Sequence, residues 1–167
     1  MGTEIIGRMI GISKSIEYST PLAIVQPLIE EFDLQLDVCA SAVNHKLPKY
    51  FTINDNALEK KWHGNCWMNP PFDRNLGLWV KKAHFESKTT EGTKVCLLPI
   101  RSNTNWWNEV CCDSEVRFIN GEVNFNDEPR GLWWPMCVMI FGDLAKVGTF
   151  STINYRTIRA ALKENNL

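Results

Sequence analysis

The sequence lacks several features that would assign it at once to a common class of protein. Its 167 residues carry 18 Lys and Arg against 19 Asp and Glu, so a formal charge of −1 gives no global basic field for nucleic acid. Local basic patches would still suffice for a DNA partner. We find no signal peptide and no apolar run of membrane-spanning length, and therefore expect no membrane partner.

The six cysteines show neither CxxC pairing nor zinc-type spacing with the three histidines. Several lie inside apolar runs, where cysteine behaves as a small buried hydrophobe. We therefore expect reduced thiols, no metal site and a cytosolic compartment. Repeats and low-complexity stretches are also absent, and the length predicts a single domain over residues 1–167.

The most informative stretch is residues 65–72, a short apolar segment that ends in Asn69-Pro70-Pro71-Phe72. Apolar residues at helical spacing follow, which predicts a strand, a rigid loop and a helix. In α/β proteins this order presents a site at the carboxyl end of the sheet.

The residue types in this loop suggest recognition of an amine. The two prolines lack N–H donors and leave carbonyls free to accept, Asn69 adds an amide oxygen, and Phe72 adds a flat apolar face. Such a loop can accept hydrogen bonds from a planar –NH2 group while an aromatic ring stacks on the attached ring. The simpler alternative is a proline-stiffened surface turn.

Three further segments place polar residues near predicted element ends. Thr20-Pro21 predicts a helix start with Thr20 as N-cap, and Pro27 predicts a kink or restart of that helix. Residues 34–40 predict the first parallel strand, and Asp37 near its end is placed either to accept from an ammonium group or to cap the next turn. Asp55 follows a second predicted strand, where a helix N-cap is the simpler role.

Residues 94–99 predict another buried strand of the parallel type, and it leads into a polar segment at 101–107. Amides and arginine can read base edges and aromatic rings can stack on bases, although core packing is the simpler role for Trp106 and Trp107. Residues 116–125, around Asn120-Gly121, predict a β-hairpin, and residues 136–142 predict the last buried strand. We place candidate DNA contacts within 101–134, at 101–107 and 120–134.

The order of these parts resembles the phage-type DNA N6-adenine methyltransferase (Dam-like) family over roughly residues 18–142. The matching features are Thr20-Pro21, residues 36–41, Asp55, the Asn-Pro-Pro-Phe loop and residues 97–101. Ala40 and Ser41 stand where a glycine-rich turn is usual. The resemblance implies an α/β fold: a compact, trimmed Rossmann-like methyltransferase sheet with helices on both faces and a small hairpin insertion.

The same resemblance implies an enzyme that uses S-adenosyl-L-methionine to methylate the N6 amine of adenine in double-stranded DNA, after flipping the base out of the duplex. The implied catalytic residues are Asn69, Pro70, Pro71 and Phe72. The implied cofactor-binding residues are Tyr18, Thr20, Pro21, Asp37, Cys39, Ala40 and Asp55. The candidate DNA-binding residues are Arg101, Asn103, Trp106 and Arg130.

Such an enzyme would act in the cytoplasm of a bacterial host. Three alternatives stay open at this point: N4-cytosine methylation, methylation of a protein glutamine amide, and a catalytically silent DNA-binding domain. The DNA target sequence and the oligomeric state are open as well.

Overall fold

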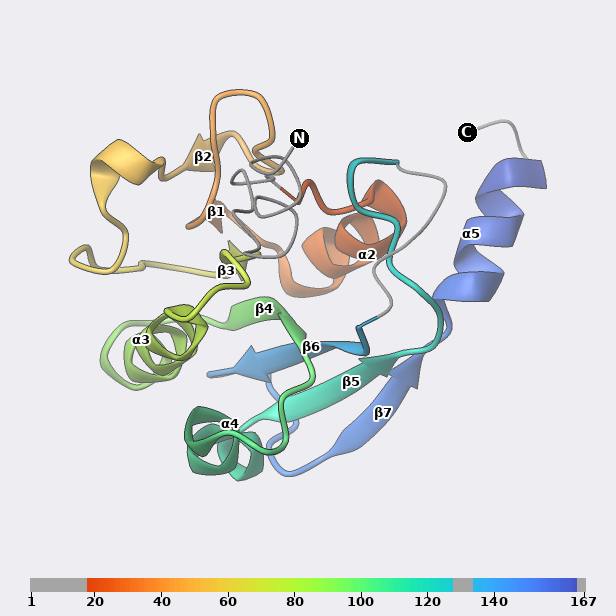
Figure 1. Ribbon diagram of the computed structural model, residues 1–167. Coiled ribbons are helices and arrows are strands. Elements are labelled where there is room, and N and C mark those ends of the chain that lie inside the picture. The colour runs from red at the N-terminus through yellow and green to blue at the C-terminus, as the bar shows by residue number, and fades with distance from the viewer. Residues whose placement is uncertain (1–17, 128–133, 165–167) are drawn as a thin grey trace, which may run out of the picture.

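The computed structural model describes residues 18–127 and 134–164. Within them, seven strands form one sheet in the order β2-β1-β3-β4-β6-β5-β7 (Figure 1). The strands are β1 (Leu36–Asp37), β2 (Lys49–Tyr50), β3 (Cys66–Met68), β4 (Lys94–Pro99), β5 (Glu115–Ile119), β6 (Met136–Phe141) and β7 (Phe150–Ile153). The α-helices are α2 (Leu22–Phe32), α3 (Leu76–Thr89), α4 (Asn105–Val110) and α5 (Tyr155–Glu164).

Strands β1 to β4 pair in parallel, as the sequence predicts. Strand β6 lies antiparallel between β4 and β5, and β5 pairs in parallel with β7 on its other side. Every residue of β3, β4 and β6 is buried, because helices cover both faces of the sheet centre. These three strands are therefore continuous apolar runs rather than alternating ones, apart from Lys94.

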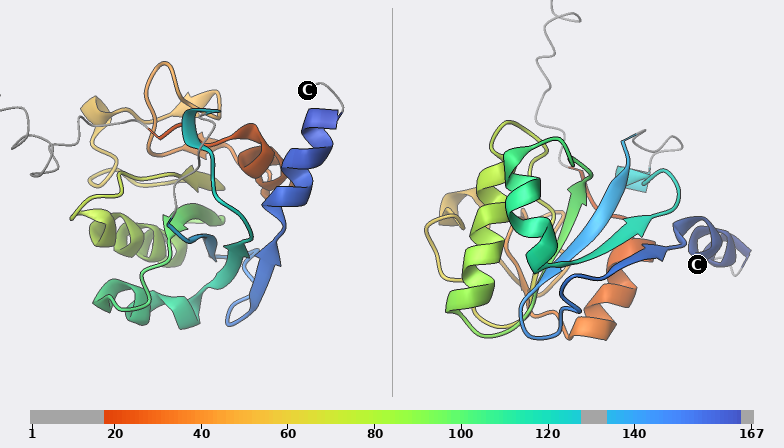
Figure 2. Two further views of the ribbon diagram at one scale, coloured as in Figure 1. Left: turned by 45° about the vertical axis from the view of Figure 1, so that its right-hand side comes forward. Right: turned by 90° about the horizontal axis from the view of Figure 1, so that it is seen from below.

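Alternate residues of the central strands point to opposite sides and build two apolar cores. Trp67, Val95 and Val138 belong to the core under α2, and Cys66, Cys96 and Met139 belong to the core under α3 and α4. Figure 2 shows α2 and α5 on one side of the sheet and α3 and α4 on the other. The predicted α/β class with helices on both faces is thus confirmed.

The predicted hairpin at residues 116–125 is wrong. Both edges of β5 are already occupied, by β6 on one side and β7 on the other. The Asn120 N–H donates to the carbonyl of Ile153. Contact with β7 therefore continues one residue beyond the end of β5. Gly121 has a positive φ of 126°, whereas Asn120 does not, so the two-residue turn that Asn-Gly favours is not formed.

Two local predictions at the first helix also need correction. The N-cap of α2 is Pro21 rather than Thr20, and no side chain caps this helix. The helix runs from Leu22 to Phe32 with Pro27 inside it, so it does not restart there. Among residues 18–127 and 134–164, no helix combines the length and the apolar character needed to cross a bilayer.

Candidate active site

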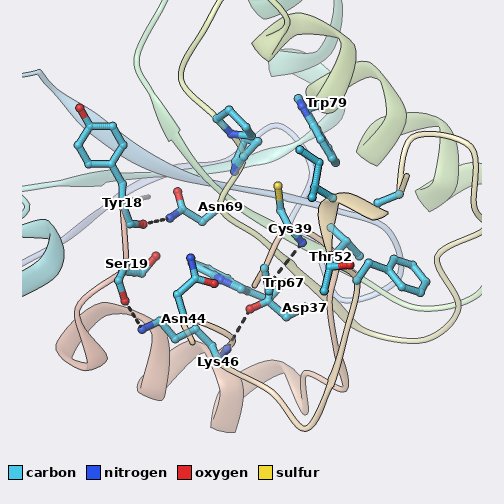
Figure 3. A pocket seen from close by; sticks show the side chains of 18 of the residues that line it. Tyr18, Ser19, Asp37, Cys39, Asn44, Lys46, Thr52, Trp67, Asn69 and Trp79 are labelled. Atoms are coloured by element: carbon cyan, nitrogen blue, oxygen red, sulfur yellow. Dashed lines mark hydrogen bonds between the residues drawn. The ribbon is translucent and has the colours of Figure 1, made fainter. Parts of the chain in front are cut away.

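The sheet reverses its strand order at β1, and this reversal positions the site. From β1 the chain moves outward to β2, then returns to form β3 on the opposite side of β1. In open α/β sheets such a switch point leaves a crevice beyond the carboxyl ends of the strands. A pocket of about 280 Å³ lies there, lined by residues at or just after the ends of β1, β2 and β3, by residues 18–20 and by Trp79 of α3 (Figure 3).

The Asn-Pro-Pro-Phe loop leaves β3 directly into this pocket, and Asn69, Pro70 and Pro71 line it. The Asn69 amide nitrogen donates to the Tyr18 carbonyl at 2.6 Å, as Figure 3 shows. Because a carbonyl accepts only from a donor, this bond fixes which way the amide lies. The Asn69 Oδ1 atom is buried and accepts no hydrogen bond within the part of the chain that the structure describes.

Phe72 lies just outside the pocket lining. Its half-buried ring stacks on Tyr18, with centroids 5.8 Å apart and planes at 17°, and meets Phe125 edge-on at 5.9 Å. Tyr18 itself lines the pocket. The aromatic surface beside Asn69 is therefore built from three chain segments, with Tyr18 nearest the pocket and Phe72 behind it.

Asp37 closes β1 and organises the loop that follows. This residue is 2% exposed, and its two carboxylate oxygens accept from the backbone N–H groups of Cys39 at 3.2 Å and Lys46 at 3.0 Å. Burial raises the pKa of the Asp37 carboxyl above its ordinary value, although both N–H donors oppose the shift. Asp37 lines the pocket, so its carboxylate has a structural role and can also face a bound cation.

The turn after β1 has a backbone conformation that residues other than glycine can adopt. Neither Cys39 nor Ala40 has a positive φ, and the Ala40 N–H donates to the Phe51 carbonyl at 3.0 Å. Both residues line the pocket. Burial raises the pKa of the Cys39 thiol to about 12, so this side chain serves as an apolar wall and is no nucleophile.

Thr20 also lines the pocket and is only 2% exposed. Its Oγ1 atom is buried and has no hydrogen-bond partner among the described residues. The neighbouring Pro21 is buried as the cap of α2 and does not belong to the described lining. A buried hydroxyl without a partner costs free energy, which is a typical mark of a site built for a ligand.

Asp55 acts on the pocket through Thr52. One of its carboxylate oxygens accepts from the Thr52 N–H at 2.8 Å and from the Thr52 hydroxyl at 2.9 Å. The lining at this point consists of Thr52, Ile53 and Asn56, whereas Asp55 is not part of it. Sequence reasoning assigned no site role to these three residues, and it also assigned none to Lys46 and Trp79.

The model of the family described as DNA N-6-adenine-methyltransferase (Dam) matches residues 13–143. The chain belongs to this family. It is 27% identical over 148 residues to the DNA N-6-adenine-methyltransferase of Haemophilus phage HP1 (strain HP1c1), covering 81% of this chain and 83% of that protein. It is also 32% identical over 95 residues to the protein of the same name from Escherichia phage T1. That match covers 55% of this chain and 39% of the phage T1 protein.

Membership in the Dam family confirms both the predicted family and the predicted enzyme class. Asn69, Thr20 and Asp37, three residues that the resemblance singles out, lie within the matched range and line one pocket. All six cysteines are free thiols. In the described part of this Dam family member, no three His, Cys, Asp or Glu side chains form a cluster that could hold a metal ion.

The candidate DNA contacts lie around the carboxyl end of β4, beside the pocket edge of the sheet. The Arg101 guanidinium stacks over the Trp134 ring at 5.2 Å, and Asn103 is exposed. Trp106 is half-buried against Trp107, and a Cβ at Gly77 of α3 would meet its ring at 2.8 Å, so this tryptophan packs two helices together. Arg130 lies outside the described residues.

Proposed function

We propose that this chain transfers a methyl group from S-adenosyl-L-methionine to the N6 amine of adenine in double-stranded DNA. One observation carries the proposal: Asn69 lines the pocket at the strand-order switch, and its amide oxygen is buried without a partner among the described residues. An exocyclic amine has two N–H donors, and this oxygen is an acceptor whose orientation is already fixed by the bond to Tyr18.

The pocket fits an S-adenosylmethionine molecule by the chemistry of its lining. The Asp37 carboxylate can accept from the amino group, and the unpaired Thr20 hydroxyl can bond to the same end of the molecule. Phe51, Ile53 and Trp79 provide apolar surface for a purine ring, with the Asn56 amide beside them. We assign the sheet to the Rossmann-like methyltransferase type, with residues 38–48 replacing a helix between β1 and β2. When bound, the cofactor supplies a methyl group activated by its sulfonium.

The contribution of Asn69 is electrostatic. The lone pair of an adenine amine is delocalised into the ring, so the amine is a poor nucleophile. Acceptance of its N–H bonds by Asn69 Oδ1 and the Pro70 carbonyl would draw the nitrogen toward tetrahedral geometry and stabilise the positive charge that develops on it. A proline-locked loop holds both acceptors in place before the substrate binds, which lowers the cost of alignment.

The target adenine lies inside a duplex and must be extruded to reach Asn69. The aromatic cluster of Tyr18, Phe72 and Phe125 borders the acceptor pair, and we propose that it supports the extruded base. Arg101 and Asn103, at the carboxyl end of β4, would contact the surrounding DNA. In this arrangement Trp106 supports the contact surface from below.

The test is transfer of a radiolabelled methyl group to unmethylated duplex DNA, followed by nucleoside analysis. We expect label in N6-methyladenine with the natural chain. Asn69→Ala should lower the rate by about 100- to 1,000-fold, as for removal of one fixed electrostatic partner of a transition state. Binding of S-adenosylhomocysteine by the variant should stay within about twofold, because Asn69 serves the amine rather than the cofactor.

Asn75→Ala is the matched control. Asn75 lies in the same loop, is exposed and makes no side-chain capping bond, so its replacement should leave the rate unchanged. Label in N4-methylcytosine or in protein would replace the proposed substrate by another amine. DNA binding without any transfer would identify a silent domain, and a fully active Asn69→Ala variant would remove the acceptor role.

A further inference from the structure

The pocket contains one group of each charge. Among the described residues that line it, Asp37 is the one acid and Lys46 is the one base. Asp37 ends β1 and Lys46 lies in the segment that joins β1 to β2, and the Lys46 backbone N–H donates to the Asp37 carboxylate at 3.0 Å. The peptide group of Lys46 is therefore anchored to the acid.

A second contact holds the Lys46 side chain. Its ammonium donates to the Ser19 hydroxyl at 2.8 Å, across 27 positions of sequence. Ser19 is itself fixed by Asn126, because the Ser19 N–H donates to the Asn126 side-chain oxygen at 2.8 Å and the Asn126 N–H donates to the Ser19 carbonyl at 3.0 Å. Figure 3 shows Ser19 and Lys46 together on one side of the pocket, with Thr52 and Trp79 on another.

A pocket with a fixed acid and a fixed base favours a ligand that carries both opposite charges. An anion alone would be attracted by Lys46 but repelled by Asp37. A cation alone would be attracted by Asp37 but repelled by Lys46. A DNA phosphate is such a lone anion. An α-amino acid group, which carries an ammonium and a carboxylate on one carbon, satisfies both residues at once.

We propose that Lys46, positioned by Ser19, binds the α-carboxylate of the methyl donor while Asp37 accepts from its α-ammonium group. The pocket thereby selects donors that keep an intact zwitterionic amino acid. This assignment rests on the proposed function for the identity of the donor, and it adds a binding residue and a specificity to it. Ser19 is a positioning residue in this scheme, because it acts through Lys46.

The test measures binding by calorimetry, without DNA and without turnover. S-adenosylmethionine is compared with decarboxylated S-adenosylmethionine, which keeps the sulfonium and the amine but lacks the carboxylate. The natural chain should bind the intact donor at least about 10-fold more tightly, the effect expected for one hydrogen-bonded charge pair. Lys46→Met should weaken binding of the intact donor by about 10- to 100-fold and leave the decarboxylated one within about twofold.

Three further variants separate charge from structure. Lys46→Arg should retain most of the preference because it retains the charge, and Ser19→Ala should reduce the preference by a smaller factor. Lys49→Met is the matched control, since Lys49 is exposed on β2 and lies outside the described lining. It should bind both donors as the natural chain does. Thermal unfolding of each variant checks that its fold is retained.

Three outcomes overturn the assignment. Equal affinity of the natural chain for the two donors would do so without any variant. Equal losses for both donors in Lys46→Met would make Lys46 a structural residue only. Undiminished binding of the intact donor by that variant would place the carboxylate elsewhere. Failure of the natural chain to bind either donor is a different result, because it refutes the proposed cofactor itself.

Discussion

The two edges of the sheet treat buried polar groups in opposite ways. At the amino edge, where β3 and β4 begin, Lys94 is 1% exposed and donates to the carbonyls of Gly64 at 2.9 Å and Glu91 at 2.8 Å. Asn65 donates to the Phe32 carbonyl at 2.7 Å and accepts from the Thr93 N–H at 2.8 Å. Both side chains have hydrogen-bond partners, several of them on other segments, so this edge ties the elements together.

At the carboxyl edge the same kind of atom is left without a partner. Thr20 Oγ1 and Asn69 Oδ1 are both buried, and within the described ranges neither makes a hydrogen bond. An unpaired buried polar atom costs roughly 1–3 kcal/mol of stability, a cost that a ligand can remove on binding. The contrast indicates that the amino edge contributes stability, whereas the carboxyl edge gives up stability for binding.

Removal of a satisfied group from the amino edge should have the largest effect on stability. Lys94→Met keeps the length of the side chain but leaves two carbonyls without their donor. We expect the free energy of unfolding to fall by about 2 kcal/mol, measured by urea denaturation. Lys88→Met is the control: its ammonium bonds to Asp113 on the surface with 58% of the side chain exposed, and its loss should cost less than about 0.5 kcal/mol. A Lys94→Met variant as stable as this control would show that the amino edge does not depend on the pairing.

Thr93→Val tests the same edge with a smaller change. The Thr93 side chain is fully buried, and its hydroxyl accepts from the Leu144 N–H at 3.0 Å. Valine has nearly the same shape but no acceptor, so the N–H loses its partner. We expect a loss of about 1 kcal/mol in the free energy of unfolding by the same measurement. An unchanged or higher stability would contradict the role given to this bond.

The sequence predicted the parts of this contrast that depend on local chemistry. Apolar runs bounded by turn residues predicted the buried strands, and the resemblance to the Dam-like family singled out Asn69, Asp37 and Thr20. The pocket that joins them depends on the switch in strand order, which is a property of the whole sheet. Its walls, which include residues outside these motifs, therefore could not be predicted from local sequence.

Sequence reasoning failed where a distant contact overrode a local signal. Asn120-Gly121 favours a hairpin, but pairing of β5 with β7 occupies the edge that a hairpin would need. The ring of Phe72 packs against Tyr18 and Phe125, two partners far from it along the chain that the local sequence did not indicate. Lys46 belongs to no recognised motif. Its side chain is held at the pocket by a contact with Ser19, which is distant in the sequence.

Thr20→Val makes at the carboxyl edge the same substitution that Thr93→Val makes at the amino edge. It should change the free energy of unfolding least of these variants, and in the opposite direction. The Thr20 hydroxyl has no partner among the described residues, so its removal takes away a cost rather than a bond. We expect the free energy of unfolding to rise by about 0.5 kcal/mol in urea denaturation, while affinity for S-adenosylhomocysteine falls. Both variants exchange a hydroxyl for a methyl group in a buried threonine. The difference between their free energies of unfolding therefore reports whether each hydroxyl is hydrogen-bonded. If Thr20→Val lost as much stability as Thr93→Val, the hydroxyl would be satisfied in solution, and the two edges would not differ in the way proposed.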